Sequence, residues 1–216
     1  MLGPYGFGRA VFNAVAAFCA LFALALGVAA AAAAPPTIVV LGDSLTAGLG
    51  LDPEQAFPAR LQAYLTERGV AVKIDNAGVS GDTSAGGRSR LDWALAGKPD
   101  AVMVELGAND ALRGIDPKVT EANLDAILAE LTRRRIKVLL CGMLAPPNLG
   151  RDYGAAFNGI YPKLAAKYHV TLYPFFLDGV AAEPALNQAD GMHPNRQGVA
   201  VIVQRIAPQV EALLKN

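Results

Sequence analysis

The sequence predicts an α/β protein in which a parallel β-sheet carries helices on both faces. Short, strongly apolar runs alternate along the chain with longer segments whose apolar residues have helical spacing. Apolar runs of this length are typical of strands that are buried on both sides, as the strands of parallel sheets are. Strands separated by helices are joined by right-handed crossovers, and these crossovers keep the strands parallel.

Five segments are predicted strands, and five longer ones are predicted helices. The predicted strands are residues 37–41, 72–74, 101–106, 138–141 and 170–173. The predicted helices are residues 58–68, roughly 88–95, 117–134, 153–168 and 194 to about 214. No internal repeat or linker interrupts this alternation, so we expect a single domain. Ligands of such sheets bind at the carboxyl ends of the strands.

The first 34 residues are predicted to be a secretory signal peptide. Arg9 precedes an uncharged run from Val11 to Ala34, which ends in consecutive alanines before Pro35. A basic start, an apolar centre and a small-residue exit are typical of such signals. The run is longer than the ~20 residues that cross a bilayer, so a retained anchor is the alternative. We expect cleavage, a mature domain of residues 35–216, and a periplasmic or secreted protein.

Charge and cysteine content exclude several classes of partner. Nineteen basic residues balance nineteen acidic ones, so no overall charge attracts nucleic acid. The predicted mature chain keeps one cysteine, Cys141, which cannot form an intramolecular disulfide. Cys141 ends an apolar run, and a buried thiol of this kind is inert. We expect no nucleic-acid partner and a packing role for Cys141.

Polar motifs follow the predicted strands at the point where each one ends. Gly42-Asp43-Ser44 follows the first strand, residues 78–82 follow the second, and Gly107-Ala108-Asn109-Asp110 follows the third. Asp190 and His193 precede the last predicted helix. Because the carboxyl ends of parallel strands share one edge of the sheet, we expect these segments to converge there.

The converging residues are suited to nucleophilic catalysis. The chain contains only two histidines, so few serines can be paired with a base. Ser44 is the predicted nucleophile, His193 its general base, and Asp190 the carboxylate that orients the imidazole. The backbone N–H groups of Ser44 and Gly81 and the side-chain amide of Asn109 are the predicted oxyanion hole. One such donor stabilises a transition state by ~3 kcal/mol.

Each of these residues also has an ordinary structural explanation when it is taken alone. A serine or asparagine after a strand is commonly a turn or helix-cap residue, and glycine-rich turns are frequent. We expect Asp43 and Asp110 to hold loop amides rather than to react. His169, at a predicted helix-to-strand junction, is interpreted as a packing or surface residue. The specificity of the prediction therefore comes from the motifs in combination.

Together the motifs resemble the SGNH, or GDSL, hydrolase superfamily. Its pattern is matched by Gly42-Asp43-Ser44-Leu45, by Gly81, by Gly107-Ala108-Asn109-Asp110 and by Asp190-Gly191-Met192-His193-Pro194. The chain looks most like the bacterial secreted arylesterase and multifunctional thioesterase I/lysophospholipase group. The resemblance implies a flavodoxin-like three-layer α/β/α fold and the roles given above for the matched residues. Thr46 stands two residues after Ser44, so the Gly-x-Ser-x-Gly elbow of α/β-hydrolases is absent.

A pocket for the acyl or aryl group of an ester is predicted beside Ser44. It would be walled by apolar residues from the loops at the same sheet edge, which are Leu112, Pro146, Tyr153, Phe157 and Met192. The alternative for the aromatic residues is core packing. We expect a small-molecule ester or lysophospholipid substrate, no cofactor and no metal. We also expect a monomer without a stable membrane partner once the signal is removed.

Other functions remain open at this point. The same superfamily contains deacetylases that act on sugars, so an acetyl-carbohydrate is an alternative substrate. A metal-dependent phosphohydrolase could use Asp43, Asp110, Asp190 and His193 as ligands, although that assignment leaves Ser44 without a role. A noncatalytic binding module is the third alternative, because a fold does not guarantee an activity.

Overall fold

The computed structural model describes residues 34–215, and those from Pro35 onward belong to one compact unit. The predicted signal peptide, residues 1–34, therefore lies outside the described residues except for its last position. Among residues 34–215, no helix is both long enough and apolar enough to cross a bilayer.

The centre of the unit is the predicted five-stranded parallel sheet. Its strands are β1 (Thr37–Gly42), β2 (Lys73–Gly78), β3 (Ala101–Glu105), β4 (Lys137–Cys141) and β5 (Thr171–Tyr173). They lie in the order β2-β1-β3-β4-β5, and all four neighbouring pairs are parallel. The register aligns Gly42 with Gly78 on one side and with Glu105 on the other. The ends of these three strands therefore meet directly below the predicted site.

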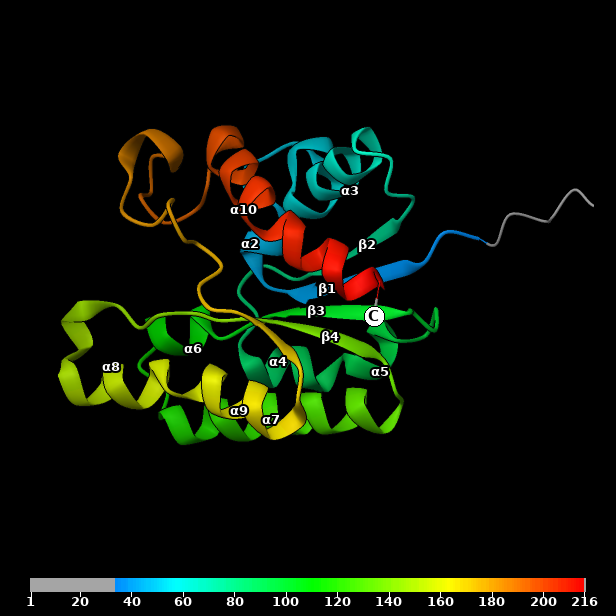
Figure 1. Cartoon of the computed structure of the whole chain (residues 1–216). Coiled ribbons are helices and arrows are strands. Elements are labelled where there is room, and N and C mark those ends of the chain that lie inside the picture. The colour runs from blue at the N-terminus through cyan, green and yellow to red at the C-terminus, as the bar shows by residue number, and fades with distance from the viewer. Residues whose placement is uncertain (1–33, 216) are drawn as a thin grey trace, which may run out of the picture. The chain divides into compact units, whose positions relative to one another are not determined.

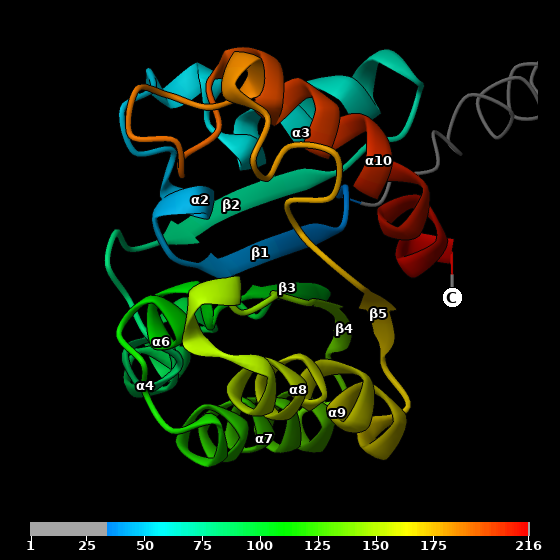
Figure 2. The same cartoon turned by 90° about the vertical axis from the view of Figure 1, so that its left-hand side faces the viewer.

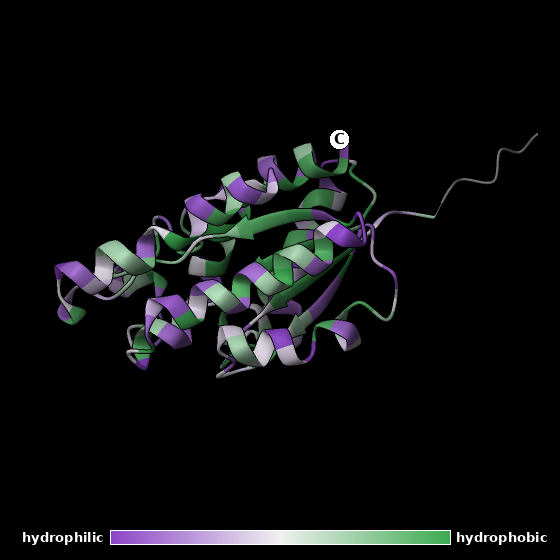
Figure 3. Ribbon diagram, turned by 90° about the horizontal axis from the view of Figure 1, so that it is seen from below, coloured by the Kyte–Doolittle hydropathy of each residue, from purple (hydrophilic) through white to green (hydrophobic). Residues whose placement is uncertain are grey.

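Two helix layers cover the sheet, as predicted (Figures 1 and 2). One face carries α3 (Phe57–Glu67) and α10 (Arg196–Lys215), which pack against each other. The other face carries α4 (Ser84–Ser89), α5 (Leu91–Ala94), α7 (Pro117–Arg133), α8 (Arg151–Asn158) and α9 (Ile160–Tyr168). The helices alternate hydrophobic and hydrophilic residues along their length (Figure 3), because only one side of each helix is buried.

Short helices occupy the loops. Two α-helical segments, α2 (Ser44–Ala47) and α6 (Ala108–Leu112), begin within three residues of the ends of β1 and β3. Three 3₁₀ turns are Pro53–Gln55, Pro147–Leu149 and Pro184–Leu186. Each 3₁₀ turn begins with proline, whose fixed φ suits a first helical position.

Several predicted elements differ from the structure. The strand predicted at 72–74 continues to Gly78, because β2 is an edge strand and can expose Asp75 and Asn76 beside water. The helix predicted at 88–95 is two helices that meet at Arg90. The helix predicted at 153–168 is likewise two helices, α8 and α9, which meet at Gly159.

The last helix begins later than predicted. Asn195 caps α10, since its Oδ1 atom accepts the N–H groups of Gln197 at 2.9 Å and Gly198 at 3.1 Å. Pro194 lies before this cap and forms a β-bridge with Asn187. His193 is therefore held by an ordered loop rather than by the first turn of a helix.

Cys141 is buried at the end of β4, as predicted. Burial, together with the nearby Glu105 carboxyl, raises the pKa of its thiol well above the usual value. A thiol that stays protonated is a poor nucleophile, so Cys141 packs rather than reacts.

Replacing Phe57 with alanine should destabilise the fold by about 3–5 kcal/mol. Phe57 is fully buried in the layer of α3, and its ring meets that of Phe176 edge to face with centroids 5.0 Å apart. Urea unfolding of the variant measures the loss. Val119→Ala is the control, because Val119 is half exposed and its truncation should change stability by less than about 0.5 kcal/mol. Equal losses in the two variants would contradict this account of the core.

Candidate active site

Ser44 lies at the first position of α2, directly beyond the end of β1. The side chain of Asp43 caps this helix, and its Oδ1 atom accepts the Leu45 N–H at 2.9 Å. The cap fixes the direction in which the chain leaves the strand. Ser44 is largely buried, yet its Oγ atom lies 2.9 Å from Nε2 of His193. The predicted nucleophile and base are therefore within hydrogen-bond distance, although 149 residues separate them in the sequence.

The other ring nitrogen of His193 contacts Asp190. Nδ1 lies 2.6 Å from Oδ2 of Asp190, while Oδ1 accepts the backbone N–H groups of Met192 at 2.9 Å and His193 at 3.0 Å. These bonds lower the pKa of Asp190 to about 2, with the backbone N–H of His193 as the largest cause and that of Met192 next. The structure thus brings the three residues into one hydrogen-bonded chain, with the carboxylate ionised at any pH near neutral.

Gly81 lies in a tight turn that follows β2. The Asp82 N–H donates to the Val79 carbonyl at 3.0 Å, and Gly81 has a φ of +85°. No other residue of this turn has a positive φ, so it is a type II turn, whose third residue is normally glycine. A positive φ reverses the central peptide relative to a type I turn, and therefore decides which way the Gly81 N–H points. Within residues 34–215, neither this N–H nor that of Ser44 donates to a protein acceptor.

The Asn109 side chain connects the Asp43-Ser44 segment with the turn that carries Gly81. Its Nδ2 atom donates to Oδ2 of Asp43 at 3.0 Å and to the backbone carbonyl of Asp82 at 2.9 Å. Both hydrogens of the amide therefore have protein acceptors in this structure. An oxyanion would have to share one of them, unlike the free N–H groups of Ser44 and Gly81.

Two buried carboxyl groups lie beneath Ser44, and the sequence analysis missed one of them. Glu105 ends β3, and its Oε2 atom accepts the Thr46 hydroxyl at 2.7 Å and the Asp43 N–H at 3.3 Å. Among the described residues, its Oε1 atom has no hydrogen-bond partner. Burial, followed by the nearby Asp43 charge, raises the pKa of Glu105 well above its usual value. A single acid that ends an otherwise apolar strand was the available signal.

Asp43 is also perturbed by burial. Desolvation raises its pKa to about 6, although the hydrogen bonds from Leu45 and Asn109 oppose the shift. Asp110 is buried too, and it accepts the Ser84 N–H at 2.7 Å and hydroxyl groups from Ser84 and Thr120. Both aspartates hold loop amides, as predicted. Among residues 34–215, no group of three or more His, Cys, Asp or Glu side chains is arranged to hold a metal ion.

The predicted acyl pocket is partly corrected by the structure. Leu112 and Met192 are 56% and 50% exposed, and Pro146 is half-buried. Tyr153 is half-buried, and its hydroxyl donates to the Ile115 carbonyl at 2.8 Å. Phe157 is completely buried, so it cannot form a pocket wall.

Phe157 instead supports the backbone behind the site. Its ring packs edge to face against Tyr161, whose hydroxyl donates to the Leu106 carbonyl at 3.0 Å. A Cβ at Gly107 would lie 3.5 Å from the Phe157 ring and only 2.2 Å from the Tyr161 hydroxyl. The two rings therefore fix the turn that leads to Asn109, and core packing was the correct interpretation of Phe157.

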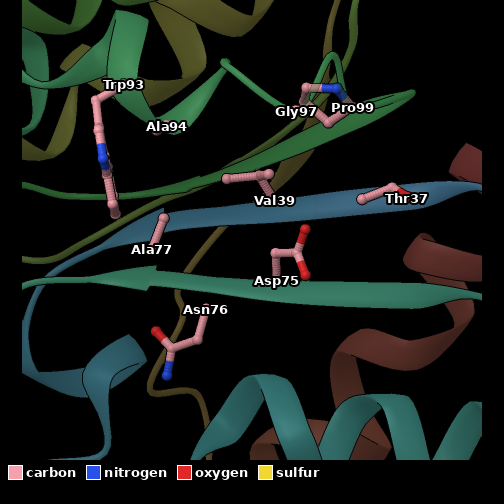
Figure 4. A pocket seen from close by; sticks show the side chains of 9 residues that line it. All are labelled: Thr37, Val39, Asp75, Asn76, Ala77, Trp93, Ala94, Gly97 and Pro99. Carbon is pink, nitrogen blue, oxygen red and sulfur yellow. The ribbon is translucent and has the colours of Figure 1, made fainter.

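A cavity of about 170 Å³ lies away from these residues (Figure 4). It is lined by Val39, Asp75 and Ala77 from β1 and β2 and by Trp93 from α5. These strand residues face the helix layer rather than the carboxyl edge of the sheet. None of the predicted site residues lines this cavity.

Comparison with known proteins agrees with the geometry. Residues 40–201 match the model of the GDSL-like lipase/acylhydrolase family. The chain belongs to this family. The resemblance inferred from the motifs is thereby confirmed, and the match spans every predicted catalytic and oxyanion-hole residue.

Relatives within the GDSL-like family match over nearly their whole length. The chain is 42% identical over 192 residues to esterase TesA of Pseudomonas aeruginosa, covering 88% of this chain and 96% of that protein. It is 41% identical over 186 residues to thioesterase 1/protease 1/lysophospholipase L1 of Escherichia coli, covering 86% and 88%. The crystal structure of esterase EstA from Pseudoalteromonas sp., inhibited by monoethylphosphonate, is 32% identical, with a TM-score of 0.79 and coverage of 83% and 99%. The flavodoxin-like α/β fold implied by the motifs agrees with this likeness.

Gly81→Ala should lower kcat for ester hydrolysis by about 10²–10³-fold, the cost of one oxyanion-hole donor. An alanine Cβ would fit, since its nearest neighbour is Arg113 Nη2 at 3.6 Å. The loss should arise because alanine disfavours the positive φ and so reverses the N–H.

Gly69→Ala is the matched control for this substitution. Gly69 has a φ of +78° and open space around it, and it lies beyond the end of α3, away from the site. It should lose similar stability in thermal unfolding and keep its kcat. An unchanged kcat in Gly81→Ala would remove Gly81 from the oxyanion hole.

The Asp190 carboxyl should titrate near pH 2 in NMR spectra of the folded protein. Because its folded pKa is below the ordinary 3.8, the stability it contributes is present above about pH 4 and is lost as the pH falls toward 2. His193→Ala should raise this pKa only in part, because both backbone N–H donors remain. A return to the ordinary value in His193→Ala would show that the imidazole, not the backbone, causes the shift.

Proposed function

We propose that this protein is a serine esterase that hydrolyses carboxylic esters through an acyl-enzyme on Ser44. The observation that carries the proposal is the continuous hydrogen-bonded chain from Ser44 Oγ through the His193 ring to Asp190, with separations of 2.9 Å and 2.6 Å. A serine becomes a useful nucleophile at neutral pH when a positioned base takes its proton. Membership of the GDSL-like lipase/acylhydrolase family supports the same reaction.

The acylation step uses each member of this chain. His193 Nε2 takes the proton as Ser44 Oγ attacks the ester carbonyl carbon, and the carbonyl oxygen becomes an oxyanion. Asp190 stabilises the resulting imidazolium through Nδ1, and its pKa of about 2 keeps it ionised. The imidazolium then gives the proton to the departing alcohol oxygen. His193 next takes a proton from the water that attacks the acyl-enzyme, and the imidazolium then gives this proton to Ser44 Oγ as the acid leaves.

The oxyanion is stabilised by backbone and side-chain donors. The N–H groups of Ser44 and Gly81 have no protein acceptor among the described residues, so both can donate to the oxyanion without losing another hydrogen bond. Asn109 supplies the third donor by sharing a hydrogen that it gives to Asp43 or Asp82. Donors of this kind act on the charge that develops in the transition state, which is why they accelerate the reaction.

The substrates proposed are aryl and acyl esters, with thioesters and lysophospholipids as further candidates. Thioesterase and lysophospholipase both appear in the name of the E. coli relative. Exposed apolar side chains come from loops that follow strands or flank His193, and they offer contact to an acyl chain; they are Leu49, Val79, Leu112, Leu144 and Met192. Half-buried Pro146 lies in the loop after β4, and half-buried Tyr153 lies near the start of α8.

We also propose that the chain is exported, cleaved near residue 35, and active as a monomer on small-molecule substrates. The signal-like composition of residues 1–34 supports export. Every group of the proposed mechanism comes from a single chain, so no second copy is required.

Ser44→Ala should abolish hydrolysis of both short and long p-nitrophenyl esters, measured by release of p-nitrophenol. Wild-type activity should persist in the presence of EDTA and disappear with a p-nitrophenyl phosphonate, which should add covalently to Ser44 in intact-mass spectra. Circular dichroism establishes that the variant is folded. Activity that survives in Ser44→Ala, or that EDTA removes, would overturn the serine mechanism.

A further inference from the structure

The turn that carries Gly81 and the strand that ends just before Ser44 share one largely buried cation. Arg90 lies between α4 and α5, and it donates from Nε to Oδ2 of Asp82 at 2.6 Å. Its Nη1 atom donates to the Ala77 carbonyl at 2.7 Å, and Nη2 to the Gly42 carbonyl at 2.8 Å. The side chains of Arg90 and Asp82 are only 16% and 18% exposed.

The three acceptors belong to three segments of the site. Gly42 ends β1 two residues before Ser44, and Ala77 lies in β2 just before the turn at 79–82. Asp82 directly follows Gly81. The guanidinium therefore bridges the end of β1, the end of β2 and the last residue of the turn at 79–82.

Arginine suits this position for a geometric reason. Its planar guanidinium presents N–H donors in fixed directions, whereas the lysine ammonium is a compact charge on a flexible stem. The Gly42 carbonyl also accepts the Val79 N–H at 3.1 Å, so the guanidinium adds a second hydrogen bond to a carbonyl in a largely buried place. The Asp82 carboxylate compensates the largely buried positive charge, so one side chain can hold two carbonyls without an unpaired ion.

We propose that Arg90 is a positioning residue that fixes the Gly81 N–H relative to Ser44. Other contacts hold the same turn. Asn109 donates to the Asp82 carbonyl and to Asp43 Oδ2, the Val79 N–H donates to the Gly42 carbonyl at 3.1 Å, and Arg113 Nη2 donates to the Gly81 carbonyl at 2.7 Å, but none of these contacts holds the Asp82 carboxylate. Arg90 touches the carbonyl of Gly42 and the carboxylate of Asp82 at once. Its removal leaves the triad atoms in place and frees the turn to shift away from the oxyanion. The proposal rests on the proposed serine esterase function.

The experiment compares Arg90→Met and Arg90→Lys with the wild type on a short p-nitrophenyl ester. In Arg90→Met, kcat should fall by about 10²-fold, as expected for a catalytic group displaced by an ångström, while KM changes by less than about threefold. Arg90→Lys should recover part of the lost kcat, because an ammonium can still bind one or two of the three acceptors. The backbone N–H signal of Gly81 in NMR spectra should move in both variants.

Arg68→Met is the control for removing a paired arginine. Arg68 joins α3 to α10 through Glu211 at 2.9 Å, away from the site, and this variant should keep both kcat and the Gly81 signal.

Asp82→Asn is the milder second variant. It weakens the ionic bond but keeps the backbone carbonyl, and Arg90→Met combined with Asp82→Asn should lose no more kcat than Arg90→Met alone. Thermal unfolding identifies the temperatures at which each variant is folded.

A folded Arg90→Met protein with wild-type kcat and an unmoved Gly81 signal would overturn the proposal. A rise in KM with an unchanged kcat would also overturn it. If Arg90→Met does not fold, an unmoved Gly81 signal and unchanged kcat in Asp82→Asn and Arg90→Lys would overturn it equally. Failure of the serine mechanism can be distinguished from failure of this proposal, because the comparison of the wild type with Ser44→Ala tests the mechanism alone. If the mechanism fails, the Gly81 N–H signal still tests whether Arg90 positions the turn.

Discussion

The close approach of α2 to the ends of β1 and β3 is the constraint on which the site depends. Gly42 permits it, because a Cβ there would lie 2.1 Å from Thr46 Oγ1 and 2.5 Å from Glu105 Oε2. With no side chain in this space, the Glu105 carboxyl reaches both the Thr46 hydroxyl and the Asp43 N–H. The first turn of α2 is thus fastened to the neighbouring strand, and Ser44 is presented at the edge of the sheet rather than on a free loop.

This arrangement places two acids where burial opposes their charge. The folded pKa of Asp43 is about 6, above the ordinary 3.8, so the stability linked to this group is present below about pH 4 and is lost as the pH rises through 6. An ionised Asp43 at neutral pH therefore costs stability. In return, both of its oxygens accept hydrogen bonds, from Leu45 and from Asn109, and these order the nucleophile turn and the oxyanion turn together. The site is one where function and stability favour different protonation states.

The sequence was sufficient for the parallel sheet and for the residues that meet at its edge, because both follow from local patterns. Apolar runs define the strands, and the motifs with Ser44, Gly81, Asn109 and His193 stand at strand ends or before the last helix. Contacts between distant segments could not be predicted in the same way. Phe157 has the helical spacing of a pocket residue as much as of a core residue, and only packing against Tyr161 decides between them. Glu105 and Arg90 matter through partners that lie between 8 and 62 residues away.

The two edges of the sheet are built differently, although the chain has no net charge. The edge opposite the site holds a cavity of about 350 Å³ lined by Arg135, Lys137 and His169, where α7 and α9 end, and the Arg135 and Lys137 cations there offset the negative ends of the helix dipoles. At the site edge, the groups proposed for the chemistry are held by hydrogen bonds from neighbouring residues. The apolar side chains proposed for the substrate, such as Leu112 and Met192, are instead exposed. These side chains make none of the hydrogen bonds within the triad. Substrate range and bond cleavage thus reside in different side chains, so the former can change by substitution at the rim while the geometry of the nucleophile persists.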